Sequence, residues 1–402
     1  MRRLRLRGRF DPGEGRVLVA LAFGIAAVEG TRPTASYRAL ELGAGAFEVG
    51  IVAGAFAALA FLVAVPIGRA VDRLGERRFL VVGAALLIMA TVIGLLLPYL
   101  VALVVMQATL GLGQVCMAIS AQTLAGNTGS SGDLRFARLS VATAFGHMFG
   151  PLLGGTVIEG GLGGLFGGGT TGALAMMACF GVAALAIASF SQPSGVRRQA
   201  TSTSPKIGIL PLLRLRGMPQ AMYVSIASLT TMDLLVAYLP VIGEERGIRP
   251  SVVGYLLATR AAMTILSRVS MGILLKSLGR RPLLLSAMAV AGGAVICIAL
   301  PVPVALLFGV MGVAGFTLGV GMPMTTAWVS ARAPEGARGI AMAVRMTGNR
   351  TSQVLVPIAL GGVAAGFGAG AIFVVSGAGL GIAAWLVRSA PLESGGAAAP
   401  PG

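Results

Sequence analysis

The sequence is poor in ionisable side chains, and the residues it lacks exclude several kinds of protein. Charged residues make up only 11% of the 402 residues. His147 is the single histidine, which excludes a centre with several histidine ligands. The three cysteines, Cys116, Cys179 and Cys297, each lie inside an apolar run, which argues against a disulfide framework or a metal site. We therefore expect no metal and no cofactor.

Two sequence motifs of enzymes and ATP-driven proteins are also missing. No G-x-x-x-x-G-K-[ST] phosphate loop occurs, so ATP is not expected to be the energy source within this chain. No H-E-x-x-H occurs, and a single histidine leaves little for a hydrolytic site in the membrane. We expect that the protein is not an enzyme.

What the sequence does contain is apolar. It is 56% hydrophobic with a mean hydropathy of +0.88, more apolar surface than one or two soluble cores can bury. A membrane-spanning helix needs roughly 20 apolar residues. Twelve such stretches lie at residues 17–37, 48–67, 79–97, 100–124, 139–158, 170–190, 219–241, 251–271, 282–302, 304–328, 340–361 and 368–387. We predict an all-α integral membrane protein with twelve transmembrane helices.

These spans divide into two sets of six around the polar stretch SQPSGVRRQATSTSPKIG. The expected organisation is two pseudo-symmetric six-helix bundles joined by a cytoplasmic linker and flanked by two short tails. The tails and linker are expected at 1–16, 191–218 and 388–402, and the bundles at 17–190 and 219–387.

The positive charge is distributed unevenly along the chain. If both termini are cytoplasmic, segments on that side hold 23 of the 31 lysines and arginines, and the outer loops hold only Arg38, Arg246 and Arg249. Such a bias sets the orientation of membrane proteins. It accounts for the net charge of +17 without a nucleic-acid partner. We expect a multi-pass protein of the cell (inner or plasma) membrane with both termini in the cytoplasm.

The two halves of the sequence repeat each other weakly. ELGAGAFEVG (Glu41–Gly50) and ERGIRPSVVG (Glu245–Gly254) share four residues at an offset of 204 positions. At the same offset, GRAVDRLGERR (Gly68–Arg78) aligns with GILLKSLGRRP (Gly272–Pro282). Halves repeated in parallel, packed about a site near the membrane midplane, are one plan of secondary transporters.

With this repeat, the chain resembles the major facilitator superfamily over nearly its whole length. The loop after the second span carries the most specific match, at Gly68, Asp72, Arg73, Gly75, Arg77 and Arg78. In the family, the acid is thought to latch the two halves together in the outward-facing state. A loop that only fixes topology needs the arginines but not Asp72, so we predict a gating role for Asp72. Lys276 replaces the acid in the second copy, and Gly68 is expected to lie close against a neighbouring element.

A second motif, GHMFGPLLGG, lies in the fifth span. It fits the family pattern G-x-x-x-G-P-x-x-G-G at Gly146, Gly150, Pro151, Gly154 and Gly155. This resemblance implies a drug:proton antiporter, usually an exporter. The alternative is ordinary packing, because glycines every four residues form a stripe against which a helix can lie closely. We interpret the neighbouring His147 as a packed side chain that bonds a neighbour rather than as a proton carrier.

The fourth span matches the family only in part. Gln107 stands where drug antiporters often have arginine. Gln107, Gly111 and Gln114 share one helical face, which either lines a polar cavity or makes interhelical hydrogen bonds.

Charged residues inside the spans need partners or a purpose, because burying a charge in lipid is costly. Glu29 and Asp233 are related by the 204-residue offset, and each lies about 12 Å deep by the helical rise. Arg260 and Arg350 reach a similar depth, so two acids and two arginines share one level. Asn349 and Gln353 lie beside Arg350 and could add hydrogen bonds. Arg32, Arg268 and Arg345 lie nearer the span ends and are expected to reach the interface, although Arg32 is also a cavity candidate that can pair locally with Glu29.

Two interpretations of these charges stay open. The first is a set of salt bridges that only holds helices together. The second is a switch, in which moving an arginine away from Glu29 or Asp233 changes whether that carboxylate holds a proton. The same arginines could instead hold an anionic substrate.

The function predicted from these features is proton-coupled export of a small, partly apolar compound by alternating access. The partners would be the substrate, protons and the lipid bilayer, with the protein acting as a monomer. An alternative is uptake or exchange of an organic anion or metabolite through the midplane arginines. An alternative of another class is a membrane sensor or scaffold that transports nothing.

Overall fold

The computed structural model describes residues 12–126, 132–191, 211, 213–334 and 338–389, and within them every regular element is a helix. Each of the twelve predicted spans falls largely within one of the long helices. These are α1 (Pro12–Glu41), α2 (Ala46–Leu74), α3 (Glu76–Leu96), α4 (Leu100–Gly126), α5 (Gly132–Ile158), α6 (Gly169–Ser189), α8 (Met218–Glu245), α9 (Pro250–Leu278), α10 (Arg280–Ala299), α11 (Val304–Arg332), α12 (Arg338–Phe367) and α13 (Gly370–Ser389). A short 3₁₀ helix, η1 (Leu162–Gly164), precedes α6.

Eleven helices in the described residues are long and apolar enough to cross a membrane. The twelfth, α12, has the length but not the hydropathy, since it carries Arg345, Asn349, Arg350 and Gln353 along its middle. Its polar residues are tolerated because they face other helices and a cavity rather than lipid.

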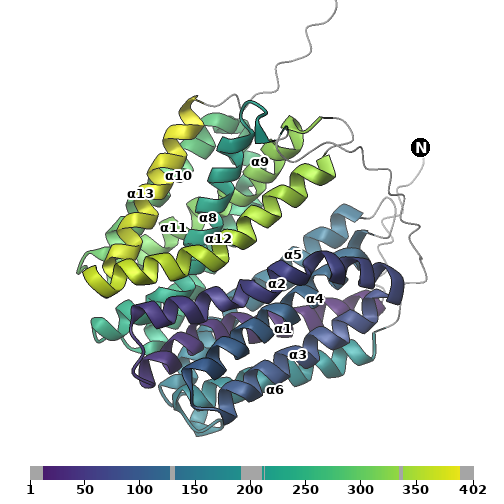
Figure 1. Ribbon diagram of the computed structural model, residues 1–402, viewed down its shortest axis with the longest axis vertical. Coiled ribbons are helices and arrows are strands. Elements are labelled where there is room, and N and C mark those ends of the chain that lie inside the picture. Colours follow the sequence, from purple (N-terminus) through teal and green to yellow (C-terminus); the bar gives the residue numbers. More distant parts are fainter. Residues whose placement is uncertain (1–11, 127–131, 192–210, 212, 335–337, 390–402) are drawn as a thin grey trace, which may run out of the picture.

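The helices form two bundles, α1–α6 and α8–α13 (Figure 1). Within the first bundle α1 packs on α5 and α6, and α4 packs on α2 and α3; the second bundle repeats this arrangement with α8–α13. The bundles meet where α2 lies along α12, α5 lies along α9, and α1 contacts α8. This is the predicted fold class. The predicted linker and both predicted tails lie mostly outside the described residues.

We call the side of the molecule that holds Pro12 and Ser389 the termini face, and the other side the opposite face. At the termini face, tight turns at Gly75 and Gly279 separate α2 from α3 and α9 from α10. Their φ angles of 93° and 77° lie in a region that favours glycine. These two residues are 204 positions apart, so the turn belongs to the repeat.

The two bundles are tightly joined near the opposite face. A Cβ atom at Gly54 of α2 would lie 2.7 Å from the carbonyl oxygen of Val354 on α12, and a Cβ atom at Gly254 of α9 would lie 2.6 Å from that of Pro151 on α5. The Tyr238 hydroxyl lies 2.8 Å from the carbonyl oxygen of Pro357 and 3.2 Å from that of Ala46, so it spans both bundles. Backbones this close leave no passage between the helix pairs at this face.

Toward the termini face the bundles diverge (Figure 1). No heavy atom lies within 4 Å of a Cβ atom built at Gly68 or at Gly272. Our expectation that Gly68 lies against a neighbour is therefore wrong for this conformation, because the bundles are apart at the position where that neighbour would be. Asp72 lies in the last turns of α2, but its side chain is outside the described part of the chain.

Candidate functional site

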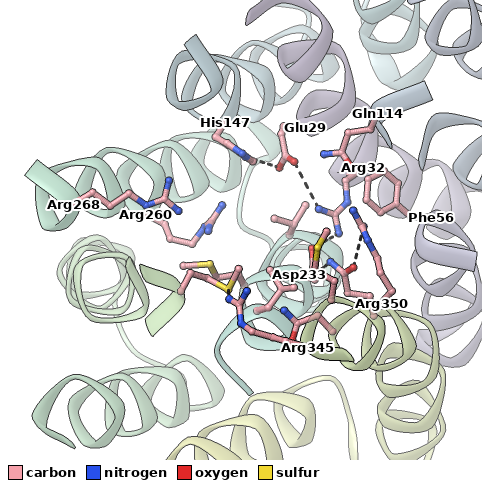
Figure 2. Close-up of a pocket in the computed structure, with 17 residues that line it drawn as sticks. Glu29, Arg32, Phe56, Gln114, His147, Asp233, Arg260, Arg268, Arg345 and Arg350 are labelled. Carbon is pink, nitrogen blue, oxygen red and sulfur yellow. Dashed lines mark hydrogen bonds and ion pairs between the residues drawn. The ribbon is translucent and has the colours of Figure 1, made fainter. Parts of the chain in front are cut away.

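A cavity of about 370 Å³ lies between the two bundles (Figure 2). Helices α1, α2, α4 and α5 line it from one side, and α8, α9, α11 and α12 from the other. Its lining is Glu29, Arg32, Phe56, Gln114, His147, Leu229, Met232, Asp233, Val236, Arg260, Arg268, Met322, Arg345, Met346, Asn349, Arg350 and Gln353.

Most of the residues predicted for proton coupling and for a substrate cavity come together here. The cavity lining includes both acids, the predicted arginines Arg32, Arg260 and Arg350, and the amides of Gln114, Asn349 and Gln353. Gln107 does not line the cavity. It is only 2% exposed and lies two helical turns from Gln114 toward the opposite face, on the same side of α4, so its prediction as a cavity residue is wrong.

Arg32 is the main cross-link between the two bundles. Its Nη2 donates to Oδ1 of Asp233 at 2.7 Å, and its Nη1 lies 3.8 Å from Oε1 of Glu29, one turn earlier on the same helix. The guanidinium also lies 4.4 Å from the ring centroid of Phe56, a cation–π contact. Arg32 is buried and does not reach the interface as expected, because both acids and an aromatic ring surround its charged end.

Asp233 extends this network within the second bundle. Its Oδ2 accepts a hydrogen bond of 2.6 Å from Nε2 of Gln353 on α12. Oε1 of Gln353 in turn accepts one of 3.0 Å from Nη1 of Arg350. Arg350 therefore reaches Asp233 only through an amide. The expected bridges from Arg260 and Arg350 to the acids are replaced by direct pairs from Arg32.

His147 lies on the other side of Glu29. Its Nδ1 is 3.4 Å from Oε2 of Glu29, so this carboxylate lies between the imidazole on α5 and the guanidinium on α1. Figure 2 shows His147, Glu29 and Arg32 in a row along one wall of the cavity. The histidine thus bonds a neighbour, as expected, but its partner is one of the two candidate proton-coupling residues.

Three further arginines line the cavity without a carboxylate partner among the described residues. Arg260 and Arg345 are 5% and 4% exposed, and the Nε atom of each is buried with no hydrogen-bond partner. Arg345 has only long contacts of 3.5 Å to the Met322 sulfur and the Thr325 hydroxyl. Arg268 is exposed and lies two turns nearer the termini face than Arg260. The expected balance of two acids and two arginines is therefore wrong, since five arginines face two acids.

A periodic signal in the sequence could have placed Arg345 in this cavity. Arg345, Asn349 and Gln353 recur every four residues, which puts them on one face of α12. Arg260, Thr264 and Arg268 recur in the same way on α9. The depth of Arg345 alone predicts that it reaches the interface, whereas the face that it shares with Gln353 places it in the cavity.

The glycine motif of the fifth span packs against two different helices. Cβ atoms at Gly146 and Gly150 would clash with Ala26 and Gly30 of α1, and Gly154 faces Thr34. Gly155 instead touches the backbone of Pro250 on α9, across the bundle boundary. The stripe therefore lets α1 lie close to α5, and its last glycine joins the two bundles.

Comparison with known proteins agrees with this architecture. No curated protein matches the sequence. A solved structure of the nucleoside transporter NupG is 11% identical, with a TM-score of 0.78 over 94% of this chain and 99% of that one. A bacterial homologue of the human lysosomal transporter Spinster, in an inward-facing and occupied conformation, is 15% identical, with a TM-score of 0.72 over 94% and 97%. Its inward-facing, unoccupied form is 16% identical, with a TM-score of 0.69 over the same shares.

The sequence also matches the model of one protein family, described as Major Facilitator Superfamily, over residues 17–242 and again over 221–401. The two matched segments together span both bundles and the cavity between them. Members of this family are membrane transporters and not enzymes. The chain belongs to the Major Facilitator Superfamily.

Proposed function

We propose that this protein carries a small organic anion across the membrane by alternating access. The observation that carries the proposal is the excess of arginine on one surface between the bundles: five arginines and two carboxylates line the cavity. For the substrate, this favours the organic-anion alternative over the small, partly apolar compound predicted first from the sequence.

Two buried arginines, Arg260 and Arg345, have no carboxylate partner among the described residues. A buried charge is tolerated when it is paired, and removing the partner of a buried ion costs several kcal/mol. Arg32 forms ion pairs with two acids, whereas Arg260 and Arg345 form none among the described residues. A negatively charged substrate would supply the missing partner each time it binds. That gives these two arginines a purpose that helix packing alone does not provide.

The cavity suits a small molecule. Its volume of about 370 Å³ lies near the lower end of the range for ligand pockets, ~300–1,000 Å³. Leu229, Met232, Val236, Met322 and Met346 also line it, so the substrate would place an apolar body against these side chains. Methionine side chains adapt to different shapes, which supports a site that takes several related compounds.

The access route follows from the contacts between the bundles. The opposite face is closed by α2 against α12 and by α5 against α9, while the bundles diverge at the termini face. Rocking of one bundle against the other would close the termini face, open the opposite face and expose the same cavity there. Glu29 and Asp233 would couple this motion to protons, since both contact Arg32, which joins the bundles. The glycine motif of α5 supports export as the direction.

The test is transport by the purified protein in lipid vesicles. We expect an imposed pH gradient to drive accumulation of small organic anions with apolar bodies, while neutral and cationic compounds of equal size stay at the level of empty vesicles. Cations carried in preference to anions would contradict the proposed substrate class. Anion transport that ignores the pH gradient would contradict only the proton coupling.

A further inference from the structure

We infer that the transported anion is a dianion, whose two negative charges neutralise Arg260 and Arg345. This rests on the proposed function and narrows it from anions in general to compounds that carry two charges. Two classes of compound carry two closely spaced negative charges on an apolar group: phosphate monoesters and compact dicarboxylates.

The number of charges follows from which arginines already have partners. Arg32 pairs with Glu29 and Asp233, and Arg350 joins the same network through Gln353, so two positive and two negative charges balance on that wall. Arg268 is exposed, and solvent and salt screen its charge. Two buried positive charges then remain in excess among the described residues, and we assign this excess to Arg260 and Arg345, which form no ion pair there. A monoanion would leave one of them unpaired.

Arg260 and Arg345 extend into the cavity from α9 and α12 (Figure 2), and neither forms an ion pair with Glu29 or Asp233, whose ion pairs are made by Arg32. Neither guanidinium has a carboxylate partner among the described residues, and the buried Nε of each still has a free N–H group. A planar guanidinium binds phosphate and carboxylate oxygens through two parallel hydrogen bonds. The two arginines together therefore offer donors for several oxygens.

A small side cavity supports the place of Arg260 in this site. It measures about 60 Å³ and lies between α5 and α9, where Arg260, Arg268 and His147 line it together with Met232 and Thr264. No carboxylate is among its lining residues. A water needs roughly 10–15 Å³ of such space, so the side cavity has room for a group of about four or five non-hydrogen atoms. A phosphate group has five non-hydrogen atoms and fits this space, and a carboxylate group, with three, is smaller.

The experiment measures selectivity between two probes of the same shape and different charge. Phenyl phosphate carries close to two negative charges at pH 7.5 because its second pKa is near 6, whereas phenyl sulfate carries one. Isothermal titration of the purified protein should give phenyl phosphate an affinity at least tenfold higher. Phthalate, a compact aromatic dicarboxylate, distinguishes a site for two carboxylates from one for a phosphate ester.

Variants of the two arginines test whether these residues cause the preference for phenyl phosphate over phenyl sulfate. In Arg260→Gln and in Arg345→Gln, the ratio of the affinity for phenyl phosphate to that for phenyl sulfate should fall to about one. Phenyl phosphate should bind more weakly, and the affinity for phenyl sulfate should not change. Arg260→Lys keeps the charge and should keep most of the ratio. Arg388→Gln, at an exposed position outside the cavity, removes the same charge and should leave the ratio as it is.

Each outcome has a definite meaning. Equal binding of both probes by the unmodified protein overturns the dianion inference but leaves the proposed anion transport standing. A ratio that survives both glutamine substitutions overturns the assignment to Arg260 and Arg345. Failure of every anion to bind overturns the proposed function as well. If a glutamine variant does not fold, the probe ratios of the unmodified protein and of the Arg260→Lys variant still decide the inference.

Discussion

Arg32 and Asp233 lie 201 positions apart in the sequence, and their side chains meet at 2.7 Å across the boundary between the two bundles. Both side chains are about nine-tenths buried. Because one residue belongs to α1 and the other to α8, any motion that separates these two helices must lengthen or break this ion pair.

The stability of the protein should depend on this pair in a non-additive way. Removing one partner of a buried ion pair costs about 3–5 kcal/mol, because the remaining charge is left without compensation. We expect Arg32→Gln and Asp233→Asn each to lower the melting temperature of the protein in detergent. The double variant should lose less than the sum of the two single losses. Strict additivity would mean that the two side chains do not depend on each other.

Proton coupling should depend on Glu29 and Asp233. Each lies beside Arg32, and Glu29 also contacts His147, so a change in any of these contacts alters which carboxylate can hold a proton. In Glu29→Gln or Asp233→Asn, a pH gradient should no longer drive net transport, while exchange of labelled for unlabelled substrate continues. Vesicle assays with and without a gradient measure both. Full gradient-driven transport by both variants would exclude these residues as the coupling site.

The closed opposite face should open when a side chain is added at Gly155. A Cβ atom there meets the carbonyl group of Pro250, so Gly155→Leu forces α5 away from α9. Distances between spin labels on cysteines at Leu165 and Phe367, one in each bundle at this face, should shift to longer values. The native cysteines would be replaced first.

Gly366→Leu is the matched control for this change. Gly366 lies on α12 near the same face, and nothing lies within 4 Å of a Cβ atom built there. Its distance distribution should equal that of the parent protein. An unchanged distribution in Gly155→Leu would show that the two helices do not need this close approach to close the face.

Asp72→Asn should slow transport and leave insertion into the membrane intact. The family resemblance gives this acid a role in holding the termini face closed, a state that differs from the one described here. The variant should spend more time open to the termini face and turn over more slowly. Lys276→Gln, at the repeat-related position, should have a smaller effect, because the latch is expected to be asymmetric. Comparable losses in the two variants would argue for a role in topology alone.

The helices could be predicted from the sequence because length and hydropathy determine which segments can cross a membrane. Their ends were harder to place. The polar stretch after residue 67 suggested that the second span ends there, yet α2 continues to Leu74, because a helix can extend beyond the apolar layer until a residue such as Gly75 ends it.

The site could be predicted less completely, because the sequence shows how deep a side chain lies in the membrane but not which neighbouring helix it faces. The sequence places Glu29, Asp233, Arg260 and Arg350 at a common level, and all four line the cavity. It does not say which helix each side chain faces. Arg32 and Arg345 both looked close enough to a span end to reach the interface, but the packing of α1 on α8 and of α12 on α11 encloses them. Which arginine pairs with which acid depends on that packing.

The buried guanidiniums of Arg260 and Arg345, which have no carboxylate partner in the part of the chain that the structure describes, also have an electrical consequence. When the cavity is empty, rocking the bundles would transfer Arg260 and Arg345 from contact with one aqueous compartment to contact with the other. Moving one elementary charge through a membrane potential of 100 mV changes the free energy by about 2.3 kcal/mol. With a dianion bound, the same step would move almost no net charge. The membrane voltage would then act on the return of the empty protein, and a potential that is negative at the termini face would hold the empty cavity open to that face.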